Sequence, residues 1–342
     1  MGVPGKILVI KPSSLGDIVH VFPALEILRR AFPDSELDFV VNPAFADILD
    51  LSPFPVRKKI LFDRKKLSKV STFFPELFHL IREIRSEQYE TVVDFQGLLR
   101  SAFMVWLTKS CVTAGFAEPK EKLAAAVYSR KIAADMKKHA VERYVELANK
   151  LCGTDLPVPE IELPEFRISD RIKGVLPEKY LVIVPGARWE SKVFPPEFFA
   201  SSFEAARKHI PELKAVIAGS GADSGIAAEI KKTVTDAIDL TGKTSLLELA
   251  GVMKFSSAVL TNDSGPMHIA AAVKDGVFAL FGPTSPGLTG PYGKGNFILR
   301  SADAGCLDCM KRRCPAKEKY LCHRIDPEDT GKKIADYIKD RK

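Results

Sequence analysis

Short apolar segments alternate with amphipathic segments along the first half of the chain. Three apolar runs predict buried strands at residues 6–11, 36–41 and 91–95. After the first run, apolar residues recur every three or four positions, at Ile18, Val21, Phe22, Leu25 and Leu28. This period predicts a helix, with a kink or a late start at Pro23. Further helices are predicted at residues 75–86 and over most of 122–151. Strands that alternate with helices indicate a parallel sheet with right-handed crossovers.

The alternation stops near residues 156–164, where prolines are frequent, and then starts again. Strands are predicted at residues 180–184, 214–218, 237–240, 258–261 and 277–281, and helices at 198–209, 227–234, 246–253 and 267–272. The expected fold class is therefore α/β, with two doubly wound, Rossmann-like parallel-sheet domains that face each other across a cleft. The expected domains are residues 1–157 and 165–325, and a polar C-terminal helix follows at 326–342.

The composition is that of a chain that can bury a large core. The 342 residues are 46% hydrophobic and 27% charged, with a formal net charge of +7. No run approaches about 18 apolar residues, so no transmembrane helix is expected. The N-terminus lacks the pattern of a signal peptide. These features predict a cytoplasmic protein.

Basic residues gather in the first predicted domain. They are Arg57, Lys58, Lys59, Arg64, Lys65, Lys66, Lys69, Arg100, Arg130, Lys131, Lys137 and Lys138, together with His139. A run of charges is usually a solvated face, but these runs lie in or beside predicted loops, which is compatible with an anionic partner. Few aromatic residues interleave with them, which argues against single-stranded nucleic acid.

The segment 261–268 (TNDSGPMH) follows an apolar strand and opens a predicted helix. Asp263 or Ser264 can cap that helix, Pro266 suits its first turn, and Gly265 allows a close approach of the backbone to a ligand. The N–H groups at such a helix start attract phosphate, although an ordinary helix cap fits these residues equally well. The loop 281–286 follows the next strand and is expected beside it.

Two further loops of the second domain carry candidate ligand-binding residues. The loop 185–192 contains Arg188 and Lys192, and each can pair with a diphosphate or remain a solvated charge. The loop 219–223 lacks the full glycine fingerprint of a dinucleotide site, so NAD is not favoured.

Asp17 lies at the end of the polar loop 13–17, between the first strand and the first helix. The dipole of a helix N-terminus favours a carboxylate there. Asp17 is therefore either a capping aspartate or a general base that faces the cleft and receives the proton of an acceptor hydroxyl.

Four of the six cysteines cluster, at Cys306, Cys309, Cys314 and Cys322. Disulfides are not expected in a chain without a signal peptide. The two residues between Cys306 and Cys309 are the spacing of a structural zinc site. The four residues before Cys314 and the seven before Cys322 are not zinc-finger spacings. A structural zinc ion and four reduced thiols therefore both remain open.

Five segments, spread in order over most of the chain, resemble glycosyltransferase family 9, the ADP-heptose:lipopolysaccharide heptosyltransferases. They are residues 6–25 (KILVIKPSSLGDIVHVFPAL), 93–102 (VDFQGLLRSA), 128–147, 261–272 (TNDSGPMHIAAA) and 281–293 (FGPTSPGLTGPYG). The runs at 96–98 and 139–143 look most like heptosyltransferase I, which adds the first heptose to Kdo on lipid A.

The resemblance implies a GT-B fold and an inverting transfer of heptose from ADP-L-glycero-D-manno-heptose to the Kdo region of lipid A. It implies no catalytic metal and no cofactor besides the donor substrate. By similarity Asp17 is the general base. The implied donor side is Lys192, Arg188, Ser191, Asp223, Asp263, Ser264, Gly265 and His268. The implied acceptor side is Ser14, Gly16, Arg64, Lys66, Gln96, Arg100, Arg130 and His139.

The chain departs from the family pattern at three places. One is the cysteine cluster at 306–322, which is not a feature of all members, although some second-heptose enzymes have a similar one. The loop 185–188 lacks the threonine pair expected near the phosphates, where Arg188 and Ser191 are the candidate substitutes, and Asp223 is the nearest carboxylate for the ribose. The resemblance further implies a Kdo2-lipid A type acceptor and a monomer that contacts the inner face of the cytoplasmic membrane. We expect that contact to come from the basic segment 57–69.

Other functions are compatible with parts of the sequence. A later heptose, or a related sugar from a nucleotide donor, is the nearest alternative. A nucleotide-sugar epimerase or a retaining GT-B enzyme would share the fold, but no glycine fingerprint follows Val9. A non-catalytic module that binds sugar nucleotides or lipids would not need Asp17. A metal-binding regulatory protein is suggested only by the cysteines.

Overall fold

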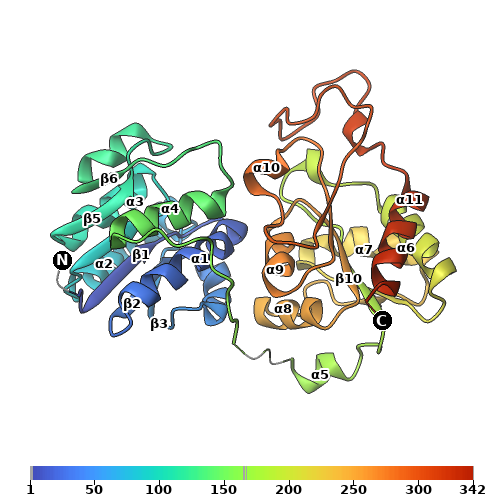
Figure 1. Cartoon of the computed structure of the whole chain (residues 1–342), viewed down its shortest axis with the longest axis horizontal. Coiled ribbons are helices and arrows are strands. Elements are labelled where there is room, and N and C mark those ends of the chain that lie inside the picture. The colour runs from blue at the N-terminus through green and yellow to red at the C-terminus, as the bar shows by residue number, and fades with distance from the viewer. Residues whose placement is uncertain (1–2, 165, 167, 342) are drawn as a thin grey trace. The chain divides into compact units, whose positions relative to one another are not determined.

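A computed structural model describes residues 3–164, 166 and 168–341 of the chain. It divides into two compact units, Met1–Pro164 and Glu165–Lys342, and Figure 1 shows a parallel sheet flanked by helices in each. The predicted fold class, two α/β units with doubly wound parallel sheets, is confirmed.

The sheet of the first unit has the strand order β3-β2-β1-β4-β5-β6, with every neighbour parallel. Its strands are β1 (Lys6–Ile10), β2 (Glu36–Val41), β3 (Val56–Leu61), β4 (Thr91–Asp94), β5 (Val112–Phe116) and β6 (Arg130–Ile132). Its helices are α1 (Leu15–Ala31), α2 (Val70–Arg85), α3 (Leu99–Thr108) and α4 (Ala140–Cys152), with short 3-10 helices η1 (Pro43–Leu51), η2 (Lys66–Ser68) and η3 (Lys122–Val127).

Helices cover both faces of this sheet, which is why its central strands are apolar throughout rather than alternating. Leu8 and Ile10 of β1 pack into a buried cluster with residues of α2, α3 and η3. On the other face α1 and α4 pack side by side. The helices lie on two faces because every crossover is right-handed, and the chain moves toward β2 after β1 but in the opposite direction, toward β5, after β4.

The second unit repeats the arrangement with the order β12-β11-β10-β7-β8-β9. Its strands are β7 (Tyr180–Val184), β8 (Lys214–Ile217), β9 (Ile238–Asp239), β10 (Ala258–Asn262), β11 (Val277–Leu280) and β12 (Phe297–Leu299). Its helices are α5 (Asp170–Lys173), α6 (Pro196–His209), α7 (Ser224–Thr233), α8 (Leu246–Lys254), α9 (Gly265–Val273), α10 (Pro286–Thr289) and α11 (Pro327–Lys339), with η4 (Glu190–Lys192), η5 (Gly221–Asp223) and η6 (Leu321–His323).

The C-terminal helix α11 belongs to the core of the second unit. Ile334, Ala335 and Ile338 are buried in the same cluster as β7, β8 and α6. Gly331 lets α11 approach α6 closely, because a Cβ at this position would collide with the carbonyl oxygen of Ser202. The sequence predicted a polar helix beyond the second domain, but the charged residues of α11 occupy only its outer face.

Two predictions for the first unit were wrong in detail. The helix expected over most of 122–151 is split into η3, β6 and α4, because residues 130–132 pair with β5 and this pairing overrides local helix propensity. The helix expected at 75–86 begins at Val70 and includes Pro75. Of the two alternatives at Pro23, the late start is not observed, because α1 begins at Leu15. Among the described residues, no helix has the length and apolar content needed to cross a membrane.

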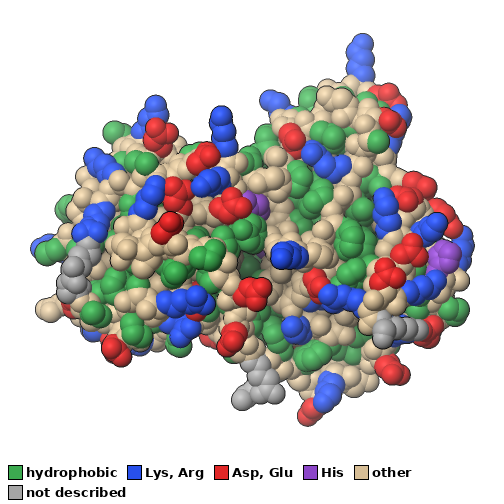
Figure 2. Space-filling model, in the orientation of Figure 1, with side chains coloured by type: hydrophobic (Ala, Val, Ile, Leu, Met, Phe, Trp, Pro, Cys, Tyr) green, Lys and Arg blue, Asp and Glu red, His purple; other side chains and the backbone are tan. Residues whose placement is uncertain are grey.

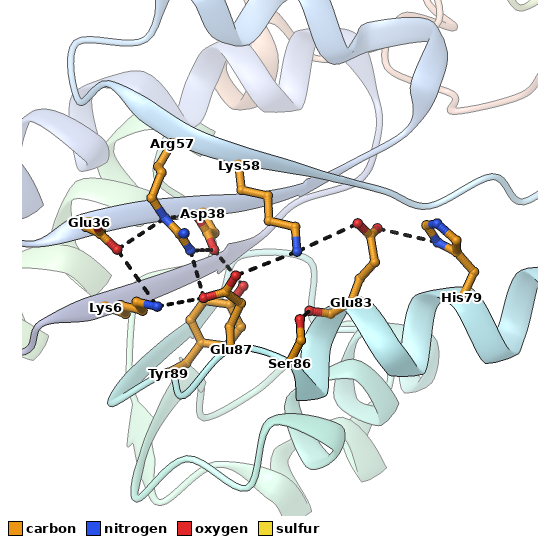
Figure 3. A network of polar contacts seen from close by, with 10 residues as sticks. All are labelled: Lys6, Glu36, Asp38, Arg57, Lys58, His79, Glu83, Ser86, Glu87 and Tyr89. Carbon is orange, nitrogen blue, oxygen red and sulfur yellow. Dashed lines mark hydrogen bonds and ion pairs between the residues drawn. The ribbon is translucent and has the colours of Figure 1, made fainter.

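The basic residues of β3 are neutralised inside the first unit. Arg57 donates two hydrogen bonds to Asp38, at 3.0 and 2.5 Å, and the Tyr89 hydroxyl donates a third at 2.7 Å (Figure 3). Asp38 is only 1% exposed, so it needs these donors. Burial and the hydrogen bond to Asp38 raise the pKa of Tyr89.

Neighbouring charges extend this network along the edge where β1, β2 and β3 begin. Ion pairs join Arg57 to Glu36 and Glu87, Lys6 to Glu87, and Lys58 to Glu83 and Glu87 (Figure 3). Lys59 pairs with Asp50. On the molecular face drawn in Figure 2, basic and acidic side chains are likewise interspersed. Residues 57–59 are therefore not an open basic surface.

We expect Arg57→Ala to lower the free energy of unfolding by about 2–3 kcal/mol, because it leaves the buried Asp38 carboxylate with Tyr89 as its remaining side-chain donor. Lys58→Ala is the matched control, because its two pairs at 3.7 Å are longer and partly solvated. It should cost about 0–1 kcal/mol. Urea denaturation followed by circular dichroism measures both, and equal losses would contradict the assignment.

Candidate functional site

Many of the predicted site residues follow the carboxyl ends of the central strands in each unit. In the first sheet β1 and β4 are neighbours, and the chain leaves them toward opposite sides. In the second sheet β7 and β10 have the same relation. In doubly wound folds, ligands bind in the crevice formed where the strand order reverses in this way.

Asp17 lies in the first turn of α1, directly after β1. Its Oδ2 accepts hydrogen bonds from the Ser14 backbone N–H at 2.9 Å and from the Ser14 hydroxyl at 2.8 Å. Ser14 is the N-cap residue, and Gly16 is buried beside it. Asp17 is half-buried, and its bond to the N-cap backbone N–H is the capping role considered from the sequence.

Lys11 is a charged neighbour of Asp17 that the sequence analysis did not select. It is 4% exposed, and its Nζ donates to the Phe95 carbonyl at 3.2 Å and lies 5.2 Å from the centre of the Tyr144 ring. Burial alone would lower the pKa of Lys11, but the negative charges of Asp17 and Asp94, together with Tyr144, outweigh it and raise the pKa. The sequence signal that could have identified Lys11 was its position as a lysine at the end of an apolar strand.

His139 joins α4 to the helix that carries Asp17. It is the N-cap residue of α4, where its Nδ1 accepts the Val141 N–H at 3.2 Å. Its ring is buried and meets the ring of His20 edge-on, with centroids 5.1 Å apart. Because His20 follows Asp17 by one helical turn, His139 lies close to the loop after β1.

The loop after β4 is held by a buried aspartate. Asp94 accepts hydrogen bonds from the backbone N–H groups of Gln96 and Gly97 at 2.7 and 3.2 Å, and from the Tyr128 hydroxyl at 2.6 Å. Burial raises the pKa of Asp94, with the hydrogen bonds opposing it. The side-chain oxygen of Gln96 is buried without a hydrogen-bond partner in the described part of the chain.

Two of the predicted acceptor arginines, Arg64 and Arg100, lie near enough to interact electrostatically. Burial and the positive charge of Arg64 lower the pKa of Arg100, while Glu121 opposes them. Two neighbouring guanidinium groups favour an anion between them. Lys66 instead pairs with Glu76 at 3.5 Å, and Arg130 is exposed on the edge strand β6.

In the second unit Asp263 links three loops. It follows β10 and is 5% exposed. Its Oδ2 lies 2.5 Å from the Lys192 ammonium of the loop after β7, and it accepts a hydrogen bond from the Thr284 hydroxyl of the loop after β11. Lys192 also lies 4.8 Å from the centre of the Trp189 ring. The expected proximity of the loops at 261–268 and 281–286 is confirmed, but Thr284 was not predicted as a site residue.

The start of α9 has the features expected of an anion site. Ser264 is its N-cap residue and Pro266 lies in its first turn, but the Ser264 side chain makes no capping hydrogen bond. Its hydroxyl is buried and lacks a partner among the residues that the structure describes. Gly265 opens the helix, and His268 is buried within it. The first N–H groups of α9 are therefore not capped by the serine.

Asp223 repeats the arrangement of Asp17. Its Oδ2 accepts the N–H and the hydroxyl of Ser220, both at 2.8 Å. The carboxylate fills the space beside Gly186, where any Cβ would collide with it. Asp223 is thereby placed against the loop after β7.

Ser191 fixes that loop to the C-terminal segment. It is buried, and its hydroxyl donates to the Lys311 carbonyl at 2.6 Å while its N–H donates to the Arg312 carbonyl at 3.2 Å. Its own carbonyl oxygen is 2.9 Å from Nε2 of His323. Arg188 of the same loop is exposed. Lys192 and Arg188 are thus the cations that this anchored loop presents.

The four clustered cysteines are all free thiols. Cys314 Sγ accepts the Tyr320 N–H at 3.5 Å, and backbone hydrogen bonds from Tyr320 and Ala316 lower its pKa. Burial, together with the charges of Cys306, Cys314 and Cys309, raises the pKa of Cys322 to about 11. Within the described ranges, no group of three or more His, Cys, Asp or Glu side chains is placed to hold a metal ion. The zinc site considered from the sequence is therefore not formed in this structure.

Comparison with known proteins gives consistent matches. The sequence model of glycosyltransferase family 9 (heptosyltransferase) matches residues 77–320. The chain is 30% identical over 317 residues to lipopolysaccharide heptosyltransferase 1 of Pseudomonas aeruginosa, which covers 90% of this chain and 87% of that protein. It is 26% identical to lipooligosaccharide heptosyltransferase 2 of Campylobacter jejuni, over 98% of both chains. The structure of E. coli heptosyltransferase WaaC with ADP superposes with a TM-score of 0.77 at 24% identity, covering 98% of this chain and 100% of that one.

We expect Lys192→Met to destabilise the second unit by about 1–3 kcal/mol, because the buried Asp263 carboxylate loses its charged partner. Arg188→Met, on the same loop, removes an exposed cation and should stay within about 0.5 kcal/mol of the parent protein. Thermal unfolding of both variants measures the difference. A Lys192 variant as stable as the Arg188 variant would show that the pair does not hold the three loops together.

Proposed function

The chain belongs to glycosyltransferase family 9, the heptosyltransferases, and is a glycosyltransferase, and we propose that it adds the first heptose of the lipopolysaccharide inner core. The donor is ADP-heptose and the acceptor is Kdo on lipid A. The proposal is carried by what each unit holds at the ends of its central strands: an anchored Lys192 and an open helix start in the second unit, and Asp17 beside Lys11 in the first.

Donor binding is assigned to the loops that meet at Asp263. Loss of ADP from the anomeric carbon leaves negative charge on the diphosphate. The Lys192 ammonium, fixed by Asp263 and Trp189, and the N–H groups at Gly265 are suited to stabilise that charge. Arg188 and Ser264 complete the phosphate side, and Asp223 beside Gly186 is assigned to the ribose.

Asp17 is assigned as the general base. The acceptor hydroxyl oxygen attacks the anomeric carbon of heptose, its proton passes to the Asp17 carboxylate, and the bond from that carbon to the diphosphate oxygen breaks, with the electron pair leaving on ADP. A single displacement of this kind inverts the anomeric configuration. A carboxylate has about four acceptor positions, so the two hydrogen bonds from Ser14 orient Asp17 without preventing proton uptake. Burial opposes a rise in the pKa of Lys11, but the negative charge of Asp17 helps to raise it, so a cation lies beside the proposed base.

The acceptor side is assigned to residues of the first unit. The Kdo region is anionic, and Arg64 and Arg100 form a neighbouring pair suited to carboxylate or phosphate. Gln96 and His139 lie on the loop after β4 and at the start of α4, and His139 packs against the helix of Asp17. Lys66 and Arg130 are more peripheral contributors, and the enzyme is assigned as a monomer at the inner face of the cytoplasmic membrane.

We expect Asp17→Asn to lower the rate of transfer ~10²–10⁴-fold, because asparagine keeps the size but cannot take up the proton. The affinity for ADP should change less than about twofold, because the donor is assigned to the second unit. Glu248→Gln is the matched control. Glu248 is the capping-box carboxylate of α8 and accepts the Ser245 N–H at 2.9 Å, so the variant loses a similar capping charge without touching the proposed base. Steady-state kinetics and titration with ADP separate the two effects, and parent-like turnover of Asp17→Asn would remove Asp17 from catalysis.

Product analysis tests the choice of acceptor. With ADP-heptose and Kdo2-lipid A, the product should gain one heptose on Kdo and, because the reaction inverts, carry the opposite anomeric configuration to the donor. Mass spectrometry and NMR of the product measure both. Transfer only to an acceptor that already carries heptose would assign the enzyme to a later step, as in the relatives called heptosyltransferase 2. No transfer to either acceptor would contradict the proposal.

A further inference from the structure

The outer surface of three neighbouring elements in the first unit is apolar. On α2, Val70, Phe74 and Phe78 are spaced by four residues and are 90%, 72% and 68% exposed. On α3, Leu99, Phe103 and Trp106 share one side, and the Phe103 and Trp106 rings stack with centroids 6.0 Å apart. Leu123 of η3 is 75% exposed. We call these seven residues the apolar face.

These residues form a single surface because their elements form a single layer. The helix α2 packs against α3, and α3 packs against η3. All three bury their opposite sides in one cluster against the sheet, through Leu80, Ile84, Met104, Val105 and Ala124. The apolar face therefore points away from the sheet and contributes little to the core.

Seven exposed large apolar side chains on one layer, four of them aromatic, point to a partner. Soluble monomers rarely expose contiguous apolar patches beyond a few hundred Å², and larger ones mark sites for proteins, membranes or ligands. Full exposure of a large apolar side chain forgoes about 1.5–3 kcal/mol of burial. Phenylalanine and tryptophan in these positions are thus more consistent with an interaction than with a surface that stays in water.

Basic side chains border the apolar face on three sides. Lys65 and Lys69 precede Val70, Arg82 and Arg85 continue the stripe of Phe78 along α2, and Lys122 precedes Leu123. All five are exposed. The acidic groups nearest in sequence are Glu76, which pairs with Lys66, and Glu121, which accepts the Leu99 N–H. The surroundings of the apolar face therefore carry a net positive charge.

This distribution differs from the membrane contact expected from the sequence. Arg57, Lys58 and Lys59 belong to the same basic segment, but their charges are consumed by Glu36, Asp38, Asp50, Glu83 and Glu87 (Figure 3). Within that segment Lys65 and Lys69 remain exposed, and both lie at the rim of the apolar face. Aromatic and aliphatic side chains at the centre with lysine and arginine around them are the composition of interfacial membrane-binding surfaces.

We propose that the apolar face docks on an anionic lipid bilayer, with Phe74, Phe78, Trp106 and Leu123 in the boundary between headgroups and acyl chains. Lysine and arginine at the rim contact the anionic headgroups. The inference rests on the proposed function in one respect, namely that the acceptor is anchored in the same bilayer. Leu99 adjoins Arg100, and Lys65 adjoins Arg64, so the arginine pair assigned to the anionic acceptor borders the docked surface.

Vesicle binding of the full chain tests the proposal without any donor or acceptor. The protein should co-sediment with vesicles of phosphatidylcholine mixed with phosphatidylglycerol, and less with pure phosphatidylcholine. Combined Phe74→Ala and Phe78→Ala substitutions should weaken partitioning on the order of tenfold or more, since two aromatic side chains no longer insert. Phe255→Ala removes a phenylalanine of the second unit that is 59% exposed and should bind as the parent does.

Tryptophan fluorescence reports the depth of insertion. The chain has two tryptophans, Trp106 and Trp189, so Trp189→Phe leaves Trp106 as the sole reporter. Anionic vesicles should shift its emission to the blue, and lipids brominated in the acyl chain should quench it. Part of the binding should survive high salt, because only the headgroup contacts are screened.

The outcomes separate this proposal from the proposed function. Binding that salt abolishes and that the Phe74, Phe78 pair does not affect would overturn insertion and leave only electrostatic contact. Absence of vesicle binding, with a dimer that the same substitutions dissociate in light scattering, would assign the apolar face to a second copy of the chain. Transfer to a soluble, deacylated acceptor reports heptosyl transfer alone. The Phe74, Phe78 variant should retain that activity and lose rate only with acceptor embedded in vesicles.

Discussion

Every strand in each of the two sheets is parallel to its neighbours, so all strands of a sheet end at the same edge. At the centre of each sheet the chain leaves two adjacent strands toward opposite sides, β1 and β4 in one unit and β7 and β10 in the other. No helix can cover the point between them, and the loops that follow these strands must line it. In the first unit the loops of Asp17 and Gln96 lie at this point, and in the second unit Lys192 meets Asp263 there, although these residues are not near in sequence.

The two edges of the first sheet use charge differently. Where β1, β2 and β3 begin, Lys6, Glu36 and Arg57 belong to a network in which cations and carboxylates neutralise one another (Figure 3). At the opposite edge Lys11 is buried among Asp17, Asp94 and Tyr144. The first arrangement satisfies buried polar groups and stabilises the sheet. The second places a lysine and two aspartates together at the ends of β1 and β4.

The same contrast separates the two outer layers of the first unit. The pair α1 and α4 is joined by the contact of His20 with His139, which connects the layer to the loop of Asp17. The layer of α2, α3 and η3 instead completes the core with its inner side and leaves aromatic residues outside. One layer is thus suited to position catalytic groups, and the other has a surface that it does not need for folding.

The sequence determined the elements whose signal is local. Apolar runs located β1, β2, β4 and most strands of the second unit, because strands buried on both faces are apolar throughout. The motif at 261–268 located the start of α9, because proline and glycine act there through backbone geometry. Asp17 was selected on similar grounds, as a carboxylate in the first turn of a helix that follows a strand.

Tertiary structure decided what depends on residues distant in sequence. The strand β6 forms within an expected helix because β5 offers it a pairing edge. Lys11 and Thr284 were missed because their roles come from Tyr144 and Asp263, which lie far from them along the chain. Arg57 and Lys58 were taken for an open basic surface because their partners Asp38, Glu83 and Glu87 belong to other elements. The pattern of residue types along the chain specifies the backbone conformation and which residues are buried. The partner of a charged side chain is set only when the elements pack, and that partner decides whether the charge is neutralised or available.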